Sequence, residues 1–75
     1  MKIEVGNYVR ISGEYPADRI LQHQTGYIEA LPNNEHPDEY LIKLDGGIAV
    51  NPHLAGRLVR VHANYLELAS TIRHA

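Results

Sequence analysis

Histidine and carboxylate side chains, which supply nitrogen and oxygen ligands to metal ions, gather in one short stretch of this chain. Residues 32–39 read PNNEHPDE and contain Glu35, His36, Asp38 and Glu39. Their spacing matches no known metal site, and a stretch of Asn, Pro and acidic residues lacks the rigid support that holds ligands in geometry. We therefore expect a solvated loop here, and the sequence predicts neither a metal nor a cofactor.

Nucleophilic catalysis has few candidate residues. The 75-residue chain has no cysteine, and neither Ser12 nor Ser70 lies in a G-x-S-x-G elbow. A phosphate-binding loop is not indicated either, because Gly46 and Gly47 are followed by Ile-Ala, without the Lys, Ser or Thr that such a loop needs. The sequence therefore predicts no catalytic residues and a protein that is not an enzyme.

Tyrosine is the residue type best suited to binding in this chain. It supplies the whole aromatic content, since there are 5 Tyr, no Phe and no Trp. A tyrosine ring offers apolar area with a polar tip, and Tyr8, Tyr15 and Tyr27 could line one aromatic binding surface. The alternative is that these rings only cover the edges of strands.

Basic residues give a second candidate binding surface, but the net charge of the chain argues against nucleic acid as its ligand. Arg10, Lys43 and Arg60 occupy outward positions, and they would form a basic patch if their strands are neighbours; scattered solubilising charge is the alternative. However, 9 acidic residues outnumber 7 Lys and Arg, for a net charge of -2, whereas nucleic-acid binders gather positive charge. No apolar run approaches the roughly 18 residues of a membrane span, and the first residues do not resemble a signal peptide, so we expect a cytoplasmic protein.

The elements that must position these side chains are short strands. Several runs of four to six residues alternate between apolar and polar, and Gly, Pro, Asn or Asp bounds each of them. This pattern predicts an all-β fold in a single domain over residues 1–75, with a core region at about 5–68 and a tail at 69–75. The expected strands cover 8–12, 27–31, 40–44, 58–61 and 65–68, with a sixth short strand at 48–50.

Alternation along these strands also predicts the core and the turns. The residues expected to point inward are Val9, Ile11, Ile28, Ile42, Leu44, Val59, Val61, Leu66 and Leu68. Gly46 or Gly47 should have a positive φ in a tight turn. His62 should cap a short 3₁₀ turn before the last strand. Ile20 and Leu21, in the long first loop, should fold back over the end of the core.

Four segments together resemble a known group of small barrels. VGNYVRISG, TGYIEAL, EYLIKLD and VRVHANYLEL are similar to segments of the SH3-like barrels of the electron transport accessory type, which include a small barrel protein of photosystem I, the ferredoxin-thioredoxin reductase variable chain and the barrel of the nitrile hydratase β chain. Residues 5–31 also resemble the KOW element of ribosomal and transcription proteins. The resemblance implies a small SH3-like barrel of five or six strands that packs against a larger protein partner or another copy of itself.

Apolar side chains that one small barrel cannot bury favour another copy of the chain as the partner. A chain of 75 residues buries only about 60% of the surface that its unfolded form exposes, and one small barrel cannot hide all its Ile, Leu and Val residues. We therefore predict a non-catalytic accessory module that forms a homo-oligomer. The predicted interface consists of Leu41, Ile48, Val50, Leu54 and Leu58.

Two alternative functions follow from the same features. The first is a KOW-like nucleic-acid-binding domain that uses the basic patch. The second is a small oligomeric enzyme or small-molecule binder, by analogy with a plasmid-borne type of dihydrofolate reductase that is also a small SH3-like barrel and builds its active site between protomers. The V-Q-I-Y signature of that reductase is missing from this sequence.

Overall fold

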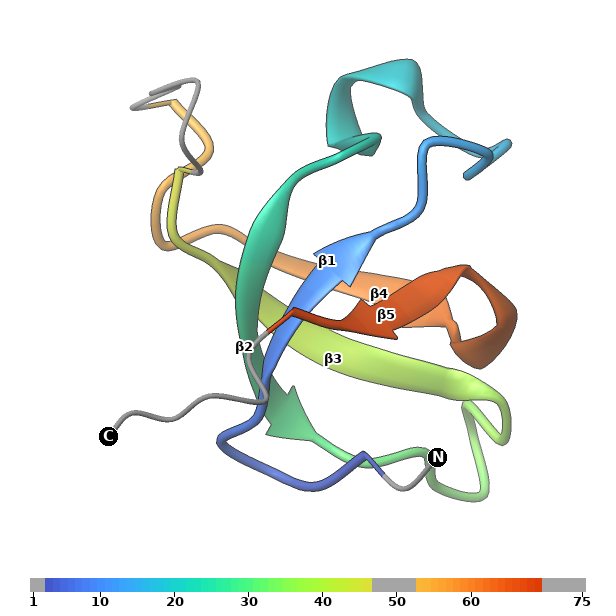
Figure 1. Ribbon diagram of the computed structural model, residues 1–75. Coiled ribbons are helices and arrows are strands. Elements are labelled where there is room, and N and C mark those ends of the chain that lie inside the picture. Colours follow the sequence, from blue (N-terminus) through green and yellow to red (C-terminus); the bar gives the residue numbers. More distant parts are fainter. Residues whose placement is uncertain (1–2, 47–52, 70–75) are drawn as a thin grey trace.

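Five antiparallel strands form one sheet in the computed structural model, which describes residues 3–46 and 53–69 (Figure 1). The strands are β1 (Tyr8–Ile11), β2 (Thr25–Ala30), β3 (Glu39–Leu44), β4 (Leu58–His62) and β5 (Leu66–Leu68). Their order across the sheet is β4-β3-β2-β1-β5. This arrangement confirms the all-β prediction, and the five strands begin and end within two residues of the predicted limits. The sixth predicted strand, at 48–50, lies outside the described residues.

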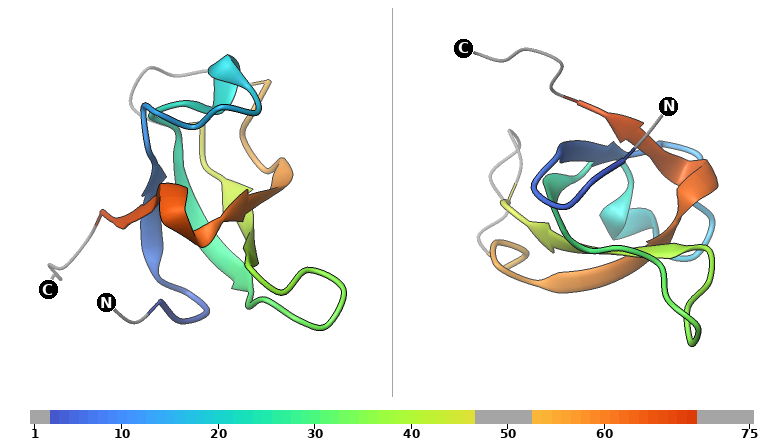
Figure 2. Two further views of the ribbon diagram at one scale, coloured as in Figure 1. Left: turned by 90° about the vertical axis from the view of Figure 1, so that its right-hand side faces the viewer. Right: turned by 90° about the horizontal axis from the view of Figure 1, so that it is seen from below.

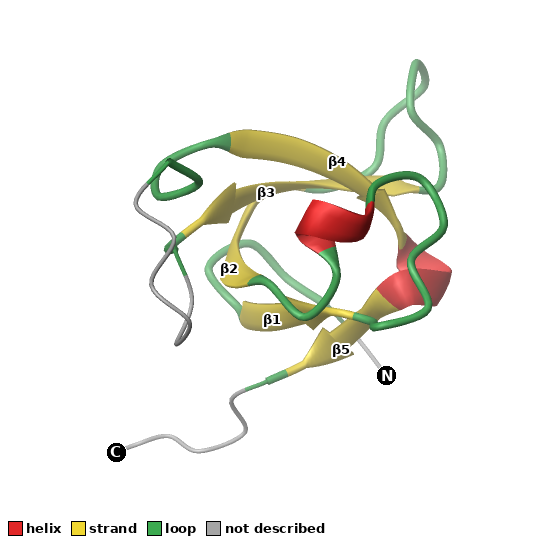
Figure 3. Ribbon diagram, turned by 90° about the horizontal axis from the view of Figure 1, so that it is seen from above, coloured by secondary structure: helices red, strands yellow, loops and turns green. Residues whose placement is uncertain are grey.

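The sheet is strongly curved because of how its two edge strands are connected. β4 and β5 lie at opposite edges of the sheet, yet only the 3₁₀ turn η2 (Ala63–Tyr65) separates them along the chain. The two edges must therefore meet at this corner, which forces the sheet to bend around its own inner face. The views from the side and from above show the strands arranged around a common interior (Figures 2 and 3).

The core lies on the inner face of this curved sheet. Seven of the nine predicted core residues are buried, and the other two, Val59 and Leu68, are partly buried and pack against them. Four further core residues come from outside the predicted set. The buried hydrophobic residues are Ile3, Val9, Ile11, Tyr15, Leu21, Ile28, Ile42, Leu44, Leu54, Val61 and Leu66.

The long connection between β1 and β2 covers one end of the core. It contains the 3₁₀ turn η1 (Arg19–Leu21), which Asp18 caps by accepting a hydrogen bond from the backbone N–H of Ile20 at 3.0 Å. Leu21 is buried, as predicted, whereas Ile20 is 61% exposed, so only one of the two residues folds back. In the view from above, η1 lies over the space that the strands surround (Figure 3). Among the described residues, no helix has the length and apolar character needed to cross a membrane.

Two turn predictions are confirmed. Gly46 has a φ of 88°, a left-handed conformation that glycine adopts without steric cost. His62 caps η2, because its Nδ1 accepts a hydrogen bond from the backbone N–H of Asn64 at 3.0 Å. Gly47 lies outside the described residues.

Candidate functional site

Four side chains form a row across the outer face of the sheet, which we call the tyrosine row: Leu58, Lys43, Tyr27 and Tyr8. Directly paired residues of neighbouring antiparallel strands point to the same side of a sheet. Lys43 of β3 pairs with Leu58 of β4 and with Tyr27 of β2, and Tyr27 pairs with Tyr8 of β1. The row therefore crosses four of the five strands. Its members are exposed, except that Tyr8 is half-buried.

The two tyrosines of the row contact each other and are anchored from one side. The ring centroids of Tyr8 and Tyr27 are 5.0 Å apart, and the ring planes are tilted by 50°, a favourable geometry for aromatic pairs. The Thr25 hydroxyl lowers the pKa of the Tyr8 phenol, but burial, a hydrogen bond to Asp45 and the charges of Asp45 and Tyr27 outweigh this effect and raise the pKa. Thr25 Oγ1 also donates to Asp45 Oδ1 at 2.8 Å. The Tyr8 ring thus packs against that of Tyr27, with Thr25 and Asp45 near its phenol.

This chain matches no known protein family, no curated protein and no solved structure.

Tyr15 does not belong to this surface, which corrects one member of the predicted aromatic set. Its side chain is only 8% exposed and lies in the core, where its ring meets the edge of Tyr65 at a centroid distance of 5.8 Å. Its hydroxyl donates to the carbonyl of Arg60 at 3.5 Å. Burial, followed by the charges of Glu39 and Asp18, raises the pKa of Tyr15. The loop that carries Tyr15 folds over the end of the core, and alternation along strands gives no information about such a residue.

The predicted basic residues are spread across the sheet. Lys43 and Arg60 lie on the neighbouring strands β3 and β4, but β2 separates Lys43 from Arg10 on β1. Nε and Nη2 of Arg10 both donate to Glu67 Oε1, at 3.1 and 2.9 Å. Within the described residues, Arg60 Nη1 is buried and has no hydrogen-bond partner. The three basic residues are therefore not side by side, and Glu67 offsets part of the charge of Arg10.

The predicted interface residues divide into three groups. Leu58 is 54% exposed and belongs to the tyrosine row, and Leu41 is half-buried on the same face, opposite Arg60. Leu54 is a correction: it is 3% exposed and part of the core, since the turn at 53–56 returns to the end of β3 through a hydrogen bond from Gly56 N to the Leu44 carbonyl. Ile48 and Val50 lie outside the described residues.

The polar loop between β2 and β3 forms an ordered turn. Asn33 Oδ1 accepts hydrogen bonds from the backbone N–H groups of Glu35 and His36, both at 2.9 Å. His36 Nδ1 lies 3.3 Å from Glu39 Oε1. Across residues 3–46 and 53–69, no three His, Cys, Asp or Glu side chains come together in a way that could hold a metal ion.

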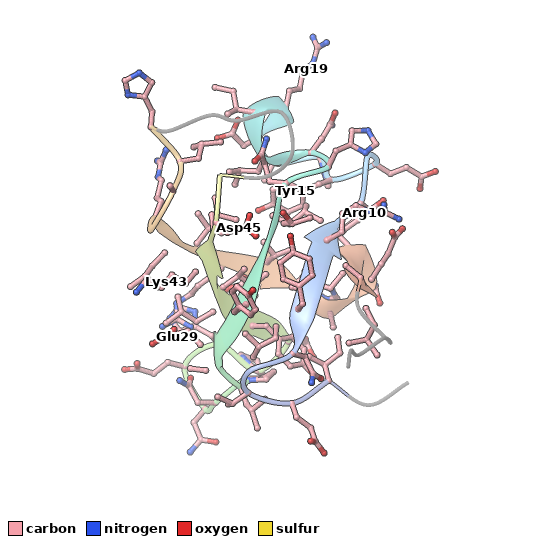
Figure 4. The ribbon with its side chains drawn as sticks, turned by 60° about the vertical axis from the view of Figure 1, so that its left-hand side comes forward. Arg10, Tyr15, Arg19, Glu29, Lys43 and Asp45 are labelled. Carbon is pink, nitrogen blue, oxygen red and sulfur yellow. The ribbon has the colours of Figure 1, made fainter. Side chains whose placement is uncertain are left out.

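Figure 4 shows the outer face with part of its charge distribution. Lys43 and Asp45 lie on the side of β3, Arg10 lies on the side of β1, and Glu29 extends near the far end of β2. Sequence reasoning identified Lys43 and Arg10 but missed Asp45 and Thr25. The side chains of Thr25 and Asp45 meet only because β2 pairs with β3, and the local sequence pattern does not predict which strands are neighbours.

Proposed function

We propose that this chain is a non-catalytic SH3-like barrel that acts through protein–protein association and binds a second copy of itself by the outer face of its sheet. The contact centres on the tyrosine row and includes Leu41 beside it. Of the five interface residues that the sequence suggested, Leu41 and Leu58 carry this proposal.

The barrel assignment is supported by the connectivity of the sheet. An SH3-like barrel joins its last two strands by a short 3₁₀ turn and covers one end of its core with a long first loop, as the resemblance in sequence implied. Here η2 joins β4 to β5, and residues 12–24 carry η1 over the core.

The observation that carries the function is the exposure of large apolar side chains in one row. Tyr27 is 50% exposed and Leu58 is 54% exposed, with only Lys43 between them. Soluble monomers rarely keep large contiguous apolar patches, and burial of this row would add to a core that is small at this chain length. A second copy of the chain is the commonest partner for such a surface.

Light scattering after size exclusion, over a range of protein concentrations, tests this function. We expect a mass that is a multiple of 8.4 kDa and that falls to the monomer value in Leu58→Asp. Ile20→Asp is the matched control, because Ile20 is even more exposed, at 61%, but lies in η1 and not on the outer face. A wild-type mass of one chain at every concentration would refute the proposal.

Nucleic-acid binding is a second candidate function for the same face. Tyr27 could stack on a base while Lys43 beside it contacts a phosphate, the combination that single-strand binders use. The net charge of -2 argues against this function. A gel shift of labelled RNA or DNA that weakens with salt and disappears in Lys43→Glu would support it, and no shift at low salt would exclude it.

A further inference from the structure

A second row of side chains runs beside the tyrosine row on the same face. Asp45 and Thr25 lie opposite each other at the ends of β3 and β2, since Asp45 N donates to the Thr25 carbonyl at 3.1 Å and Thr25 Oγ1 donates to Asp45 Oδ1. Thr25 pairs with Arg10 of β1, and Arg10 pairs with Glu67 of β5. An acid and a base therefore flank β2, with Asp45 on the β3 side and Arg10 on the β1 side (Figure 4).

We infer that two copies of the chain pack by these outer faces around a two-fold axis that runs parallel to β2 and passes beside Tyr27. This inference rests on the proposed self-association and specifies its geometry. Two sheets that pack face to face lie about 10 Å apart with their strands nearly aligned, which such an axis produces. The axis exchanges the two sides of β2, so whatever lies on the β3 side of one copy meets the β1 side of the other.

The exchange brings complementary groups together. Asp45 meets the partner's Arg10, Lys43 meets the ring of the partner's Tyr8, and Tyr27 meets the partner's Tyr27. The first contact joins opposite charges, and the second places an ammonium group against an aromatic ring, which attracts it. Because the axis is two-fold, each of the first two contacts occurs twice in the dimer.

Arg10 can bind the carboxylate of the partner's Asp45 and keep its hydrogen bonds to Glu67 in its own chain. Its bond to Glu67 uses Nε and Nη2, and Nη1 lies on the other arm of the guanidinium group. The pair with Glu67 is also exposed, with both side chains at about half of their full exposure, so it holds Arg10 in place only weakly. A guanidinium group has enough donors to bridge two carboxylates.

The other two-fold axis that would stack these faces is less favourable. An axis along the tyrosine row, perpendicular to the strands, would place Lys43 against the partner's Lys43, and like charges across an interface are unfavourable. With this axis, Asp45 of one copy would also no longer face Arg10 of the other. Charge complementarity therefore selects the axis parallel to β2.

Charge reversal in two separate variants tests this geometry. In Arg10→Glu and in Asp45→Lys, both contacts between position 45 and the partner's position 10 would join like charges, so we expect the dissociation constant of each variant alone to rise by more than about tenfold. In an equimolar mixture, one contact regains its native pair and the other gains the reversed pair. The mixture should form dimers that contain one copy of each variant, detected by native mass spectrometry.

Matched controls carry the same change of charge elsewhere. Arg19→Glu lies in η1 and Glu35→Lys in the loop at 32–39, both exposed and away from the outer face. These controls should dimerise like the wild type. Circular dichroism of each variant identifies any loss of folding. A second measurement that does not depend on charge is oxidation of Tyr27→Cys, which should give a disulfide-linked dimer because the chain has no other cysteine, whereas Lys43→Cys should not.

The outcomes separate the interface from the proposed function. A wild-type protein that is monomeric at all concentrations overturns both. A wild-type dimer that survives both charge reversals, or folded variants that stay monomeric when mixed, leaves self-association intact and overturns this interface. Failure of Tyr27→Cys to cross-link a wild-type-like dimer overturns it as well.

Discussion

Gly26 should tolerate no side chain, although nothing in its own backbone conformation requires glycine. It lies on the inner face of β2, opposite Leu44 of β3. The neighbouring pair, Thr25 and Asp45, exchanges a ladder hydrogen bond from Asp45 N to the Thr25 carbonyl. The pair of Gly26 and Leu44 is therefore a non-hydrogen-bonded pair, the type in which the Cα atoms of antiparallel strands come closest. β2 and β3 thus approach each other closely at this glycine.

Replacement of Gly26 by alanine would make a methyl group clash with the backbone of β3. A Cβ atom at Gly26 would overlap the carbonyl oxygen of Lys43, and it would lie 2.9 Å from Leu44 Cα and 3.0 Å from Ile42 Cγ2. Two of these three atoms belong to the backbone, which can move only if strand pairing is disturbed. Overpacking typically costs about 1 to 3 kcal/mol, and a stretched ladder hydrogen bond adds about 1 kcal/mol. We therefore expect Gly26→Ala to lower the free energy of unfolding by about 2 to 4 kcal/mol.

Gly13 provides a matched comparison. A Cβ atom at Gly13 would also overlap a neighbour, but that neighbour is the ring of His23, an exposed side chain that can turn away. An alanine also restricts the unfolded chain, which favours folding by roughly 0.4 to 1 kcal/mol where the native backbone accepts it. The expected change in stability for Gly13→Ala is therefore below about 1 kcal/mol in either direction.

Urea unfolding at one protein concentration, followed by circular dichroism and tyrosine fluorescence, measures both variants. A fixed concentration is needed because self-association adds to the apparent stability. If Gly26→Ala costs no more than Gly13→Ala, then contact with the backbone of a neighbouring strand is no harder to relieve than contact with an exposed side chain, and the reasoning fails.

Three further predictions use the same measurement. Val61→Ala and Leu66→Ala should each cost about 2 kcal/mol or more, since both side chains are buried, and a loss below about 0.5 kcal/mol would contradict their place in the core. His62→Ala should cost about 1 kcal/mol by removing the cap of η2, while an unchanged midpoint would mean that the cap contributes nothing. Burial raises the pKa of Tyr15 above its value of about 10 in the unfolded chain, so the unfolded state loses this proton more readily. Stability should therefore fall as the pH rises from about 10 through the folded pKa, and Tyr15→Phe should reduce this fall relative to the wild type.

The strands were predictable because their signal is local. In β1 and β4, apolar residues alternate with polar ones, and the period of two alone places Val9 and Val61 inward. His62 was predictable as a cap for a similar reason, because the residues that it bonds lie within two positions of it. Such features depend on a few neighbouring residues, so the sequence contains the information directly.

The buried loop residues were not predictable in the same way. Tyr15 and Leu54 lie in segments without alternation, and each is buried only because its loop folds over an end of the core that other strands build. The requirement for glycine at Gly26 comes from the backbone of β3, about eighteen residues later in the chain. In each case the deciding contact joins segments that are distant in sequence.

The candidate surface combines both kinds of information. The sequence indicated Tyr8, Tyr27 and Leu58 separately as residues with more apolar area than an outward position needs. Only the strand order places Tyr27 between Tyr8 and Lys43, and only the pairing of β2 with β3 brings Asp45 to the Tyr8 phenol.

Anchoring of Tyr8 bears on how the surface could bind. Free tyrosine side chains lose rotational freedom when a partner immobilises them, at a cost of about 0.5 to 1.5 kcal/mol each. Tyr8 is already restrained in the single chain, because its half-buried ring packs against the ring of Tyr27. Part of that entropy cost therefore arises during folding and not on binding. A partner that covers the tyrosine row then binds more tightly than it would bind the same row with a freely rotating Tyr8. The two rows of the outer face are also linked electrostatically, because Asp45, which raises the pKa of Tyr8 within its own chain, is the group that the proposed axis brings to the partner's Arg10.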